Sequence, residues 1–268
     1  MRIFNSLLLT VTVLIITGCR TMMLNQNGET LNASRQESCF YAENGATVTQ
    51  FGNSGPEIAL GYRHRFAITD NLEFQLRTDN YTNLVFHSAF YISTYNYLDA
   101  GVKVSLYSSE KFNMAILPYA GIYGGVAWLS LFTNGILGPV TGVSLILSNE
   151  IQNQNENLKT SIYYGLSFEI KEDLLSLKDS CYSLSKGYIT PLPFIDIDAG
   201  ISFGYELQSK GVNRLDKTVI SANRFETGIT ASFNTSLFYN PQKNNIEELR
   251  MNPVKFSVYF LYGFGRIY

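Results

Sequence analysis

The stretch IDIDAGISFGYEL, residues 195–207, places an apolar side chain at every second position and a polar or small one between. Successive side chains of a β-strand point to opposite faces, so a period of two predicts a strand with one apolar and one polar face. The stretch also exceeds the roughly 9 to 11 residues that a tilted membrane-spanning strand needs. It therefore predicts a strand able to cross a bilayer with its apolar face turned to lipid.

The same alternation recurs along most of the chain. Besides 195–207, alternating segments lie at 58–68, 72–77, 98–106, 112–120, 140–147, 162–170, 225–233 and 254–264, with a weaker first strand at 46–51. No segment requires a helix. We predict an all-β fold, an antiparallel transmembrane β-barrel of about ten strands. Twelve is the main alternative count, because residues 84–92 also alternate.

The connections between the predicted strands differ in length. Residues 69–71 and 108–111 are short turns, whereas 78–96, 125–138, 171–189 and 239–253 are long. Membrane barrels of bacteria place short turns on the periplasmic side and long loops outside. A soluble barrel or sandwich would show the same alternation with its apolar faces turned inward, and this stays the structural alternative.

Composition favours the membrane barrel. Charged residues make up 16% of the 268 residues, against roughly 25% in soluble domains. Aromatic residues reach 14%, with 18 Tyr and 18 Phe, and such rings are frequent in strands and at membrane interfaces. A net charge of −2 argues against nucleic acid as a partner, because phosphate binding needs clustered Lys and Arg.

The polar faces of the predicted strands carry charges of both signs together with glycines. Glycine weakens a solvated strand but suits a crowded interior, and buried charges are tolerated only when paired. We therefore expect a lumen filled by a network of paired charges. Its predicted members are Arg63, Arg65, Glu73, Arg77, Asp99, Lys103, Glu169, Asp196, Asp198, Glu226 and Lys255.

The first residues resemble a bacterial lipoprotein signal. Arg2 precedes an apolar run from Leu7 to Ile16, and the run ends in Ile16-Thr17-Gly18-Cys19, which is similar to a lipobox. The resemblance implies export, removal of residues 1–18 and lipidation, for example by palmitate, at Cys19. Residues 19–44 would then be a lipidated flexible tether and 45–268 the barrel domain. A plain signal peptide is the alternative interpretation.

The last strand resembles the closing strand of outer-membrane barrels. KFSVYFLYGFGRIY, residues 255–268, alternates the aromatic residues Phe260, Tyr262 and Phe264 and ends in Tyr268, although Arg266 departs from the pattern. The resemblance implies a location in the bacterial outer membrane, membrane lipid as a partner, and recognition of these four aromatic residues by barrel-assembly machinery.

The two other cysteines, Cys39 and Cys181, are expected not to pair. We place Cys39 before the first strand on the periplasmic side and Cys181 in the external connection 171–189. The two thiols would then lie on opposite sides of the membrane.

No pattern of catalytic or metal-binding residues is present in the sequence. Of the two histidines, His64 interrupts an apolar face and His87 has Ser88 beside it, but neighbouring residues of a strand point to opposite faces. We expect no enzyme activity, no metal and no cofactor. The leading hypothesis is a structural or surface-exposed barrel whose loops contact an unknown ligand. A narrow pore for small solutes and a soluble β-rich lipoprotein are the alternatives.

Overall fold

The computed structural model describes residues 26, 28–31, 35–48, 54–86, 90–129, 132–151, 158–173, 194–212, 219–240, 245–249 and 254–267. These residues form strands throughout, apart from the short segment before residue 35 and the turns at 70–71 and 109–111. The strands are β1 Arg35–Val48, β2 Ser54–Thr69, β3 Leu72–Phe86, β4 Phe90–Ser108, β5 Phe112–Leu129, β6 Phe132–Ile151, β7 Leu158–Asp173, β8 Phe194–Val212, β9 Val219–Asn240, β10 Asn245–Leu249 and β11 Val254–Ile267.

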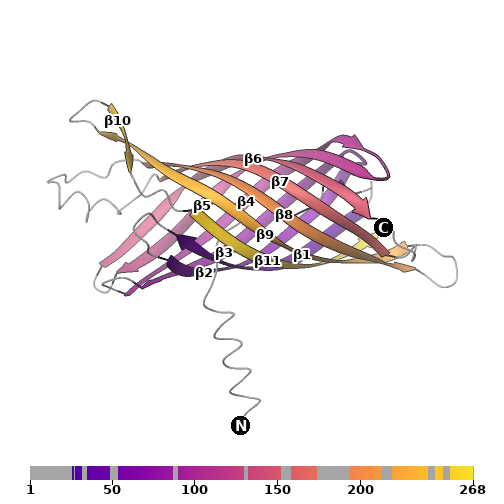
Figure 1. The fold of residues 1–268 in the computed structure, drawn as a ribbon, viewed down its shortest axis with the longest axis horizontal. Helices are drawn as coiled ribbons and strands as arrows, with labels where there is room; N and C mark the ends of the chain where they lie inside the picture. Colours follow the sequence, from indigo (N-terminus) through magenta and orange to yellow (C-terminus); the bar gives the residue numbers. More distant parts are fainter. Residues whose placement is uncertain are drawn as a thin grey trace, which may run out of the picture.

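Ten of these strands close into an antiparallel barrel (Figure 1). Each strand pairs with its neighbours in sequence, and the ring closes where β1 pairs with β11, from Arg35 opposite Ile267 to Val48 opposite Val254. The predicted ten-strand barrel is thus confirmed, and the alternative count of twelve is wrong. We call the end where β1 begins and β11 ends the terminal end, and the opposite end the loop end.

The short strand β10 lies outside the ring. It pairs only with the last residues of β9, from Asn245 opposite Asn240 to Leu249 opposite Ser236. Figure 1 shows it projecting at the loop end, opposite the C-terminus. Because β8 pairs with the same part of β9 from the other side, the wall of the barrel is extended there by a small three-stranded flap.

The two faces of the wall differ in polarity as the alternation requires. Outward side chains are large and apolar, and Leu60, Ile201 and Ile229 each expose more than half of their surface. Inward side chains are mostly charged, hydroxylated or tyrosine, and they are buried. The soluble alternative, with apolar faces turned inward, is therefore wrong. No helix among the described residues is long and apolar enough to cross a membrane.

Toward the loop end the outward face becomes polar. On β3 the outward positions change from Phe74 and Leu76 to Thr78 and Asn80, and Asn80 donates a hydrogen bond to Asn96 of β4 at 2.9 Å. Exposed amides bonded in this way suit water or lipid head groups better than hydrocarbon. The apolar band therefore ends near Thr78 on this side of the barrel.

Several predicted boundaries need correction. The first strand is β1, Arg35–Val48, and not residues 46–51, so residues 35–44 belong to the wall and not to a tether. On its outward face only Phe40 is large and apolar, and for this reason its alternation was weak. Two predicted long loops, 78–96 and 125–138, are mostly strand, because β3 and β4 continue to Phe86 and from Phe90, and β5 and β6 continue to Leu129 and from Phe132.

Candidate functional site in the lumen

A cluster of arginines and glutamates, which we call the arginine cluster, fills the lumen near the terminal end. Its central cation is Arg224 of β9, whose guanidinium lies 3.4 Å from Glu37, 3.5 Å from Glu206 and 3.2 Å from Glu226. All four side chains are buried. One cation thus neutralises carboxylates from β1, β8 and β9.

Two further arginines extend the arginine cluster along β2. Arg65 lies 3.2 Å from Glu37 and 3.4 Å from Glu73 of β3. Arg63 lies 3.7 Å from Glu226, so the cluster continues back to β9. Charges removed from water are stable only when their partners are close, and these alternating signs meet that requirement.

Two smaller ion-pair groups lie further toward the loop end. Arg77 lies 2.6 Å from Asp99 and 3.2 Å from Asp79. On the β7–β8 side, Lys171 pairs with Asp198 and lies 3.4 Å from Glu169. Paired charges therefore occupy the lumen at more than one level.

Tyrosines fill the space between these charges. Tyr119 donates a hydrogen bond to Glu169 at 2.7 Å, and Tyr163 donates one to Glu226 at 3.1 Å. Tyr163 and Tyr259 are also hydrogen-bonded to each other. Because the rings are buried and the hydroxyls of Tyr119 and Tyr163 are bonded to carboxylates, the tyrosines link the packing of the lumen to its ion pairs.

Four tyrosines of the lumen each lie over a glycine of the neighbouring strand. The pairs, directly opposite in register, are Tyr41 with Gly61, Tyr119 with Gly142, Tyr163 with Gly204 and Tyr259 with Gly228. A side chain at any of these four glycines would collide with the ring of its partner. An aromatic ring that covers a strand glycine restores the packing that glycine lacks.

Residues 26 and 28–31 of the N-terminal segment enter the terminal end of the lumen, and we call them the plug. Gln26 is fully buried and exchanges two side-chain hydrogen bonds with Gln75, of 2.7 and 3.2 Å. The amide of Gly28 donates to Ser148 at 3.0 Å, and the amide of Leu31 donates to Glu73 at 2.9 Å. The predicted tether is therefore docked inside the barrel at these residues.

The plug also joins the charges of the wall. Lys103 donates to the backbone carbonyl of Glu29 at 2.5 Å, and Lys159 lies 2.8 Å from the Glu29 carboxylate and 3.0 Å from Glu150. Thr30 donates to the carbonyl of Asp70 in the β2–β3 turn at 2.6 Å. Through these bonds the plug contacts β3, β4, β6 and β7, and its bond to Glu73 joins it to the edge of the arginine cluster.

The ion pair of the plug sets the acidity of Glu29. Burial raises the pKa of this carboxyl, but the charge and hydrogen bond of Lys159, together with the charges of Arg224 and Lys103, hold the pKa below its usual range. A carboxyl with a lower pKa in the docked state favours docking above the pKa of the undocked form, and this contribution is lost as the pH falls through the docked pKa. Acidification should therefore weaken docking.

We expect a nuclear magnetic resonance titration of Glu29 to show this shift. With the Glu side-chain carboxyl carbons labelled and Glu29 assigned from a Glu29→Gln sample, the midpoint should lie below the usual value of about 4.3. In Lys159→Gln the midpoint should rise above that of the parent protein, because burial then acts against less positive charge. An unchanged midpoint in Lys159→Gln would show that the ion pair does not form.

Nine of the eleven predicted lumen residues have described side chains, and all nine are buried. Four of them belong to the arginine cluster: Arg63, Arg65, Glu73 and Glu226. Arg77 is paired with Asp99, and Lys103 donates a hydrogen bond to the plug. Glu169 and Asp198 share Lys171. The side chains of Asp196 and Lys255 lie outside the described part of the chain.

The prediction omitted several residues of the same network. Arg224, Glu206 and Lys171 occupy inward positions of β9, β8 and β7, and continued counting of alternate positions would have found them. Glu37 and Cys39 were missed because β1 was taken for tether. Cys39 lies within β1 and not before it, as a buried free thiol 2.9 Å from Glu37. Cys181 lies outside the described residues, so the expected absence of a bridge stays a prediction.

The remaining candidate residues lie on the outside or beyond the described part. Phe260, Tyr262 and Phe264 point outward and are exposed, whereas Tyr268 and Cys19 are not described. His64 is half-buried on the outward face, where its Nδ1 lies 3.1 Å from the hydroxyl of Ser38. His87 is not described. Within the described residues no group of His, Cys, Asp and Glu is arranged to hold a metal ion.

A closed antiparallel barrel with an apolar outside and a polar, charged inside is the architecture of transmembrane β-barrels of the outer-membrane type. Such a wall leaves no unpaired strand edge in the ring, and its apolar outward face is suited to contact with lipid. The fold and the lumen together place the chain in this class.

Comparison with known proteins finds likeness in architecture alone. No protein-family model matches the chain, and no curated protein matches it in sequence. Among solved structures, the translocator domain of the autotransporter NalP from Neisseria meningitidis is 9% identical, with 88% of this chain and 89% of that chain covered and a TM-score of 0.42. The β domain of the Bordetella autotransporter BrkA is 7% identical, with 85% and 99% covered and a TM-score of 0.44.

A third barrel of this kind is the outer-membrane protease OmpT from Escherichia coli. It is 7% identical, with 90% of this chain and 100% of that chain covered and a TM-score of 0.39. All three scores lie below 0.5, so these likenesses add nothing to what the strands of this chain define.

Proposed function

We propose that the chain is an outer-membrane barrel lipoprotein with a structural or surface-exposed role and a closed lumen. The observation that carries the proposal is the plug inside the terminal end, where Gln26 is 0% and Leu31 2% exposed. The terminal end would face the periplasm, as the short turns of such barrels do. The loop end would then present the external loops to contacts outside the cell.

The width of the barrel supports a closed lumen. An eight-stranded barrel is just filled by its own side chains, and wide aqueous channels appear at about 16 strands. Ten strands leave somewhat more room than eight. Here that room is taken by large tyrosine and arginine side chains and, at the terminal end, by the plug.

Conductance in planar bilayers tests the closed lumen. The full-length protein, purified in detergent and shown to be folded by heat-modifiable gel mobility, should insert without reproducible unitary current steps. Regular steps of one size would contradict the closed lumen and favour the narrow pore. Folded protein recovered in the bilayer by immunodetection is the control that separates a closed barrel from a failure to insert.

Arginine in the outward apolar band should impair membrane insertion. Leu166, at the middle of β7, is 55% exposed, and arginine at the bilayer midplane costs about 2 to 4 kcal/mol. We expect Leu166→Arg to reduce the folded, heat-modifiable fraction after refolding into lipid vesicles. The matched control is Leu106→Arg, 52% exposed but near the end of β4, where the cost falls to about 0 to 1 kcal/mol. Equal effects of the two substitutions would argue against membrane burial of this band.

Lipidation at Cys19 is part of the proposal and rests on the lipobox-like sequence. Growth with labelled palmitate should transfer label to the parent protein and not to Cys19→Ala. Because the barrel itself spans the membrane, Cys19→Ala should remain in the membrane fraction. A parent protein without label would remove the lipid anchor from the proposal and leave the barrel unaffected.

The predicted lack of enzyme activity stays a prediction, as does recognition of the last strand by barrel-assembly machinery. The described lumen carries no histidine, because His64 points outward. For the last strand, the outward aromatic rings of Phe260, Tyr262 and Phe264 support the proposal.

A further inference from the structure

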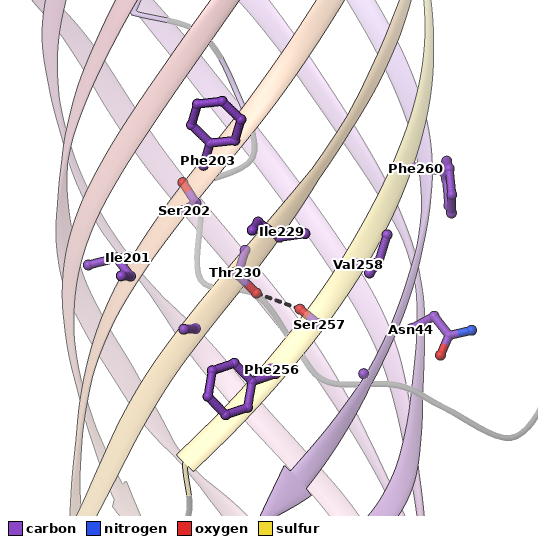
Figure 2. Close-up of a pocket in the computed structure, with 12 residues that line it drawn as sticks. Asn44, Ile201, Ser202, Phe203, Ile229, Thr230, Phe256, Ser257, Val258 and Phe260 are labelled. Carbon is purple, nitrogen blue, oxygen red and sulfur yellow. Dashed lines mark hydrogen bonds between the residues drawn. The ribbon is translucent and has the colours of Figure 1, made fainter.

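An apolar groove of about 700 Å³ runs across the outside of the barrel over β8, β9, β11 and β1. Its walls are the outward side chains Ile201, Phe203, Ile229, Phe256, Val258 and Phe260 (Figure 2). Each of these is between 42 and 57% exposed, so the groove opens away from the lumen.

The floor of the groove is formed at Ala231. This small residue lies directly opposite Ile201 on β8 and Phe256 on β11. A methyl group between two large side chains leaves a depression in an otherwise even apolar surface. Beneath the floor, the hydroxyls of Thr230 and Ser257 are hydrogen-bonded to each other (Figure 2). Ser257 also donates to Glu43 at 2.5 Å. The hydroxyls of Thr230 and Ser257 are therefore satisfied within the barrel.

Two residues that line the groove have a buried polar atom without a hydrogen-bond partner among the described residues: Ser202, whose side chain lies on the inward face of β8, and Asn44. Asn44, on the outward face of β1, lies at the edge of the groove (Figure 2), and its buried Oδ1 accepts no hydrogen bond from any described residue. A buried carbonyl oxygen without a donor destabilises the protein, so a hydrogen-bond donor from outside the chain would be favoured at this position. Asn44 follows Phe40 and Ala42 along the outward face of β1 and lies opposite Ile58 of β2 and Val258 of β11.

From this geometry we propose that the groove binds one acyl chain of a membrane lipid whose head group donates a hydrogen bond to Asn44. The acyl chain would lie over Ala231, and the donor, an amine or hydroxyl, would meet the carboxamide of Asn44 at the edge of the groove. The inference rests on the proposed membrane insertion. A second copy of the chain would be an alternative occupant, and the test separates the two.

Photolabelling with lipids tests the groove. The full-length protein is placed in phosphatidylglycerol vesicles that contain a trace of phosphatidylethanolamine or phosphatidylcholine, each with a diazirine in one acyl chain. After irradiation, adducts are mapped by mass spectrometry. We expect phosphatidylethanolamine, whose head group donates hydrogen bonds, to label the groove residues at least about 3-fold more than Leu98 and Ile122 on the opposite wall.

Two substitutions test the contact of the acyl chain and the contact of the head group separately. Ala231→Phe fills the floor and should reduce groove labelling by both lipids several-fold, whereas the matched control Ala120→Phe, on the outward face of β5, should leave it unchanged. Asn44→Leu keeps the size of the side chain and should remove the preference for phosphatidylethanolamine over phosphatidylcholine, because phosphatidylcholine has no head-group donor.

Three results would overturn the proposal. Equal labelling of the groove and the opposite wall would show no site, and a preference unchanged in Asn44→Leu would remove the role of its carbonyl. Chemical cross-links between two chains through the groove would assign it to a second copy. No labelling of the outward face at all, Leu98 and Ile122 included, would instead refute membrane insertion and with it the proposed function.

Discussion

Replacement of Arg224 by leucine is expected to lower the free energy of unfolding by about 3 to 5 kcal/mol, the cost of removing one partner from a buried ion pair. Glu37, Glu206 and Glu226 all lie within 3.5 Å of this guanidinium. Leucine would leave their carboxylates buried with less positive charge nearby. The urea dependence of the heat-modifiable gel band in detergent measures the loss.

The matched control is Lys159→Leu. Lys159 also pairs with two carboxylates, but its side chain is 17% exposed and lies at the rim. Because partly exposed ion pairs contribute about 0 to 1 kcal/mol, this variant should lose far less stability. A loss in Arg224→Leu no larger than in Lys159→Leu would mean that the arginine cluster is hydrated and not buried.

The substitution Gly28→Val is expected to expel the plug from the lumen. A Cβ atom at residue 28 would lie 2.8 Å from the backbone oxygen of Asn113 and 3.2 Å from that of Ile146. These atoms belong to the paired ladder of β5 and β6, so the wall cannot yield as a flexible side chain would. The bonds from the plug to Gln75, Ser148 and Glu73 would be lost together.

Amide hydrogen exchange of the plug measures its release. Several hydrogen bonds of about 1 kcal/mol each support docking, so the Gly28→Val variant should lose at least about 100-fold of the protection at Leu31. The control is Thr30→Val, which places the same side chain in the same segment and removes only the bond to Asp70. It should lose about 10-fold or less. Equal protection in the parent protein and Gly28→Val would show that the plug is not docked.

The Gly28→Val variant also tests whether the plug or the remaining side chains of the lumen block ion flow through the barrel. Tyr163, Tyr259 and the arginine cluster remain in place when the plug leaves. We therefore expect Gly28→Val to stay without unitary current steps. Steps that appear only in Gly28→Val would assign closure to the plug alone.

The alternation in the sequence predicted the strands of the wall correctly where one face was clearly apolar and the other clearly polar. Residues 195–207 alternate over their whole length, and β8 contains them all. In contrast, β1 was largely missed because Gln36, Ser38, Ala42 and Asn44 share its outward face with only one large apolar residue. The alternation there is carried by the inward Glu37, Cys39, Tyr41 and Glu43, which resemble an ordinary polar segment.

The lumen was predictable as a kind of environment but not as a set of contacts. Glycines and charges on the same strand faces indicated a crowded interior with paired charges. The partners of each charge depend on how far each strand is shifted against the next, and alternation does not contain that shift. No signal in the sequence indicated the plug, because residues 26 and 28–31 dock through backbone amides, polar side chains and one glycine, which any linker can contain.

The four tyrosine–glycine pairs restrict how the strands of the barrel can align with one another. They lie on four separate seams of the barrel, β1–β2, β5–β6, β7–β8 and β9–β11. A slip of one residue at such a seam would turn either the ring or the glycine to the wrong face, and a slip of two would set the ring against a position that carries a side chain. Misaligned closures would thus be disfavoured by collision, so the correct alignment of the strands is specified by shape as well as by ion pairs.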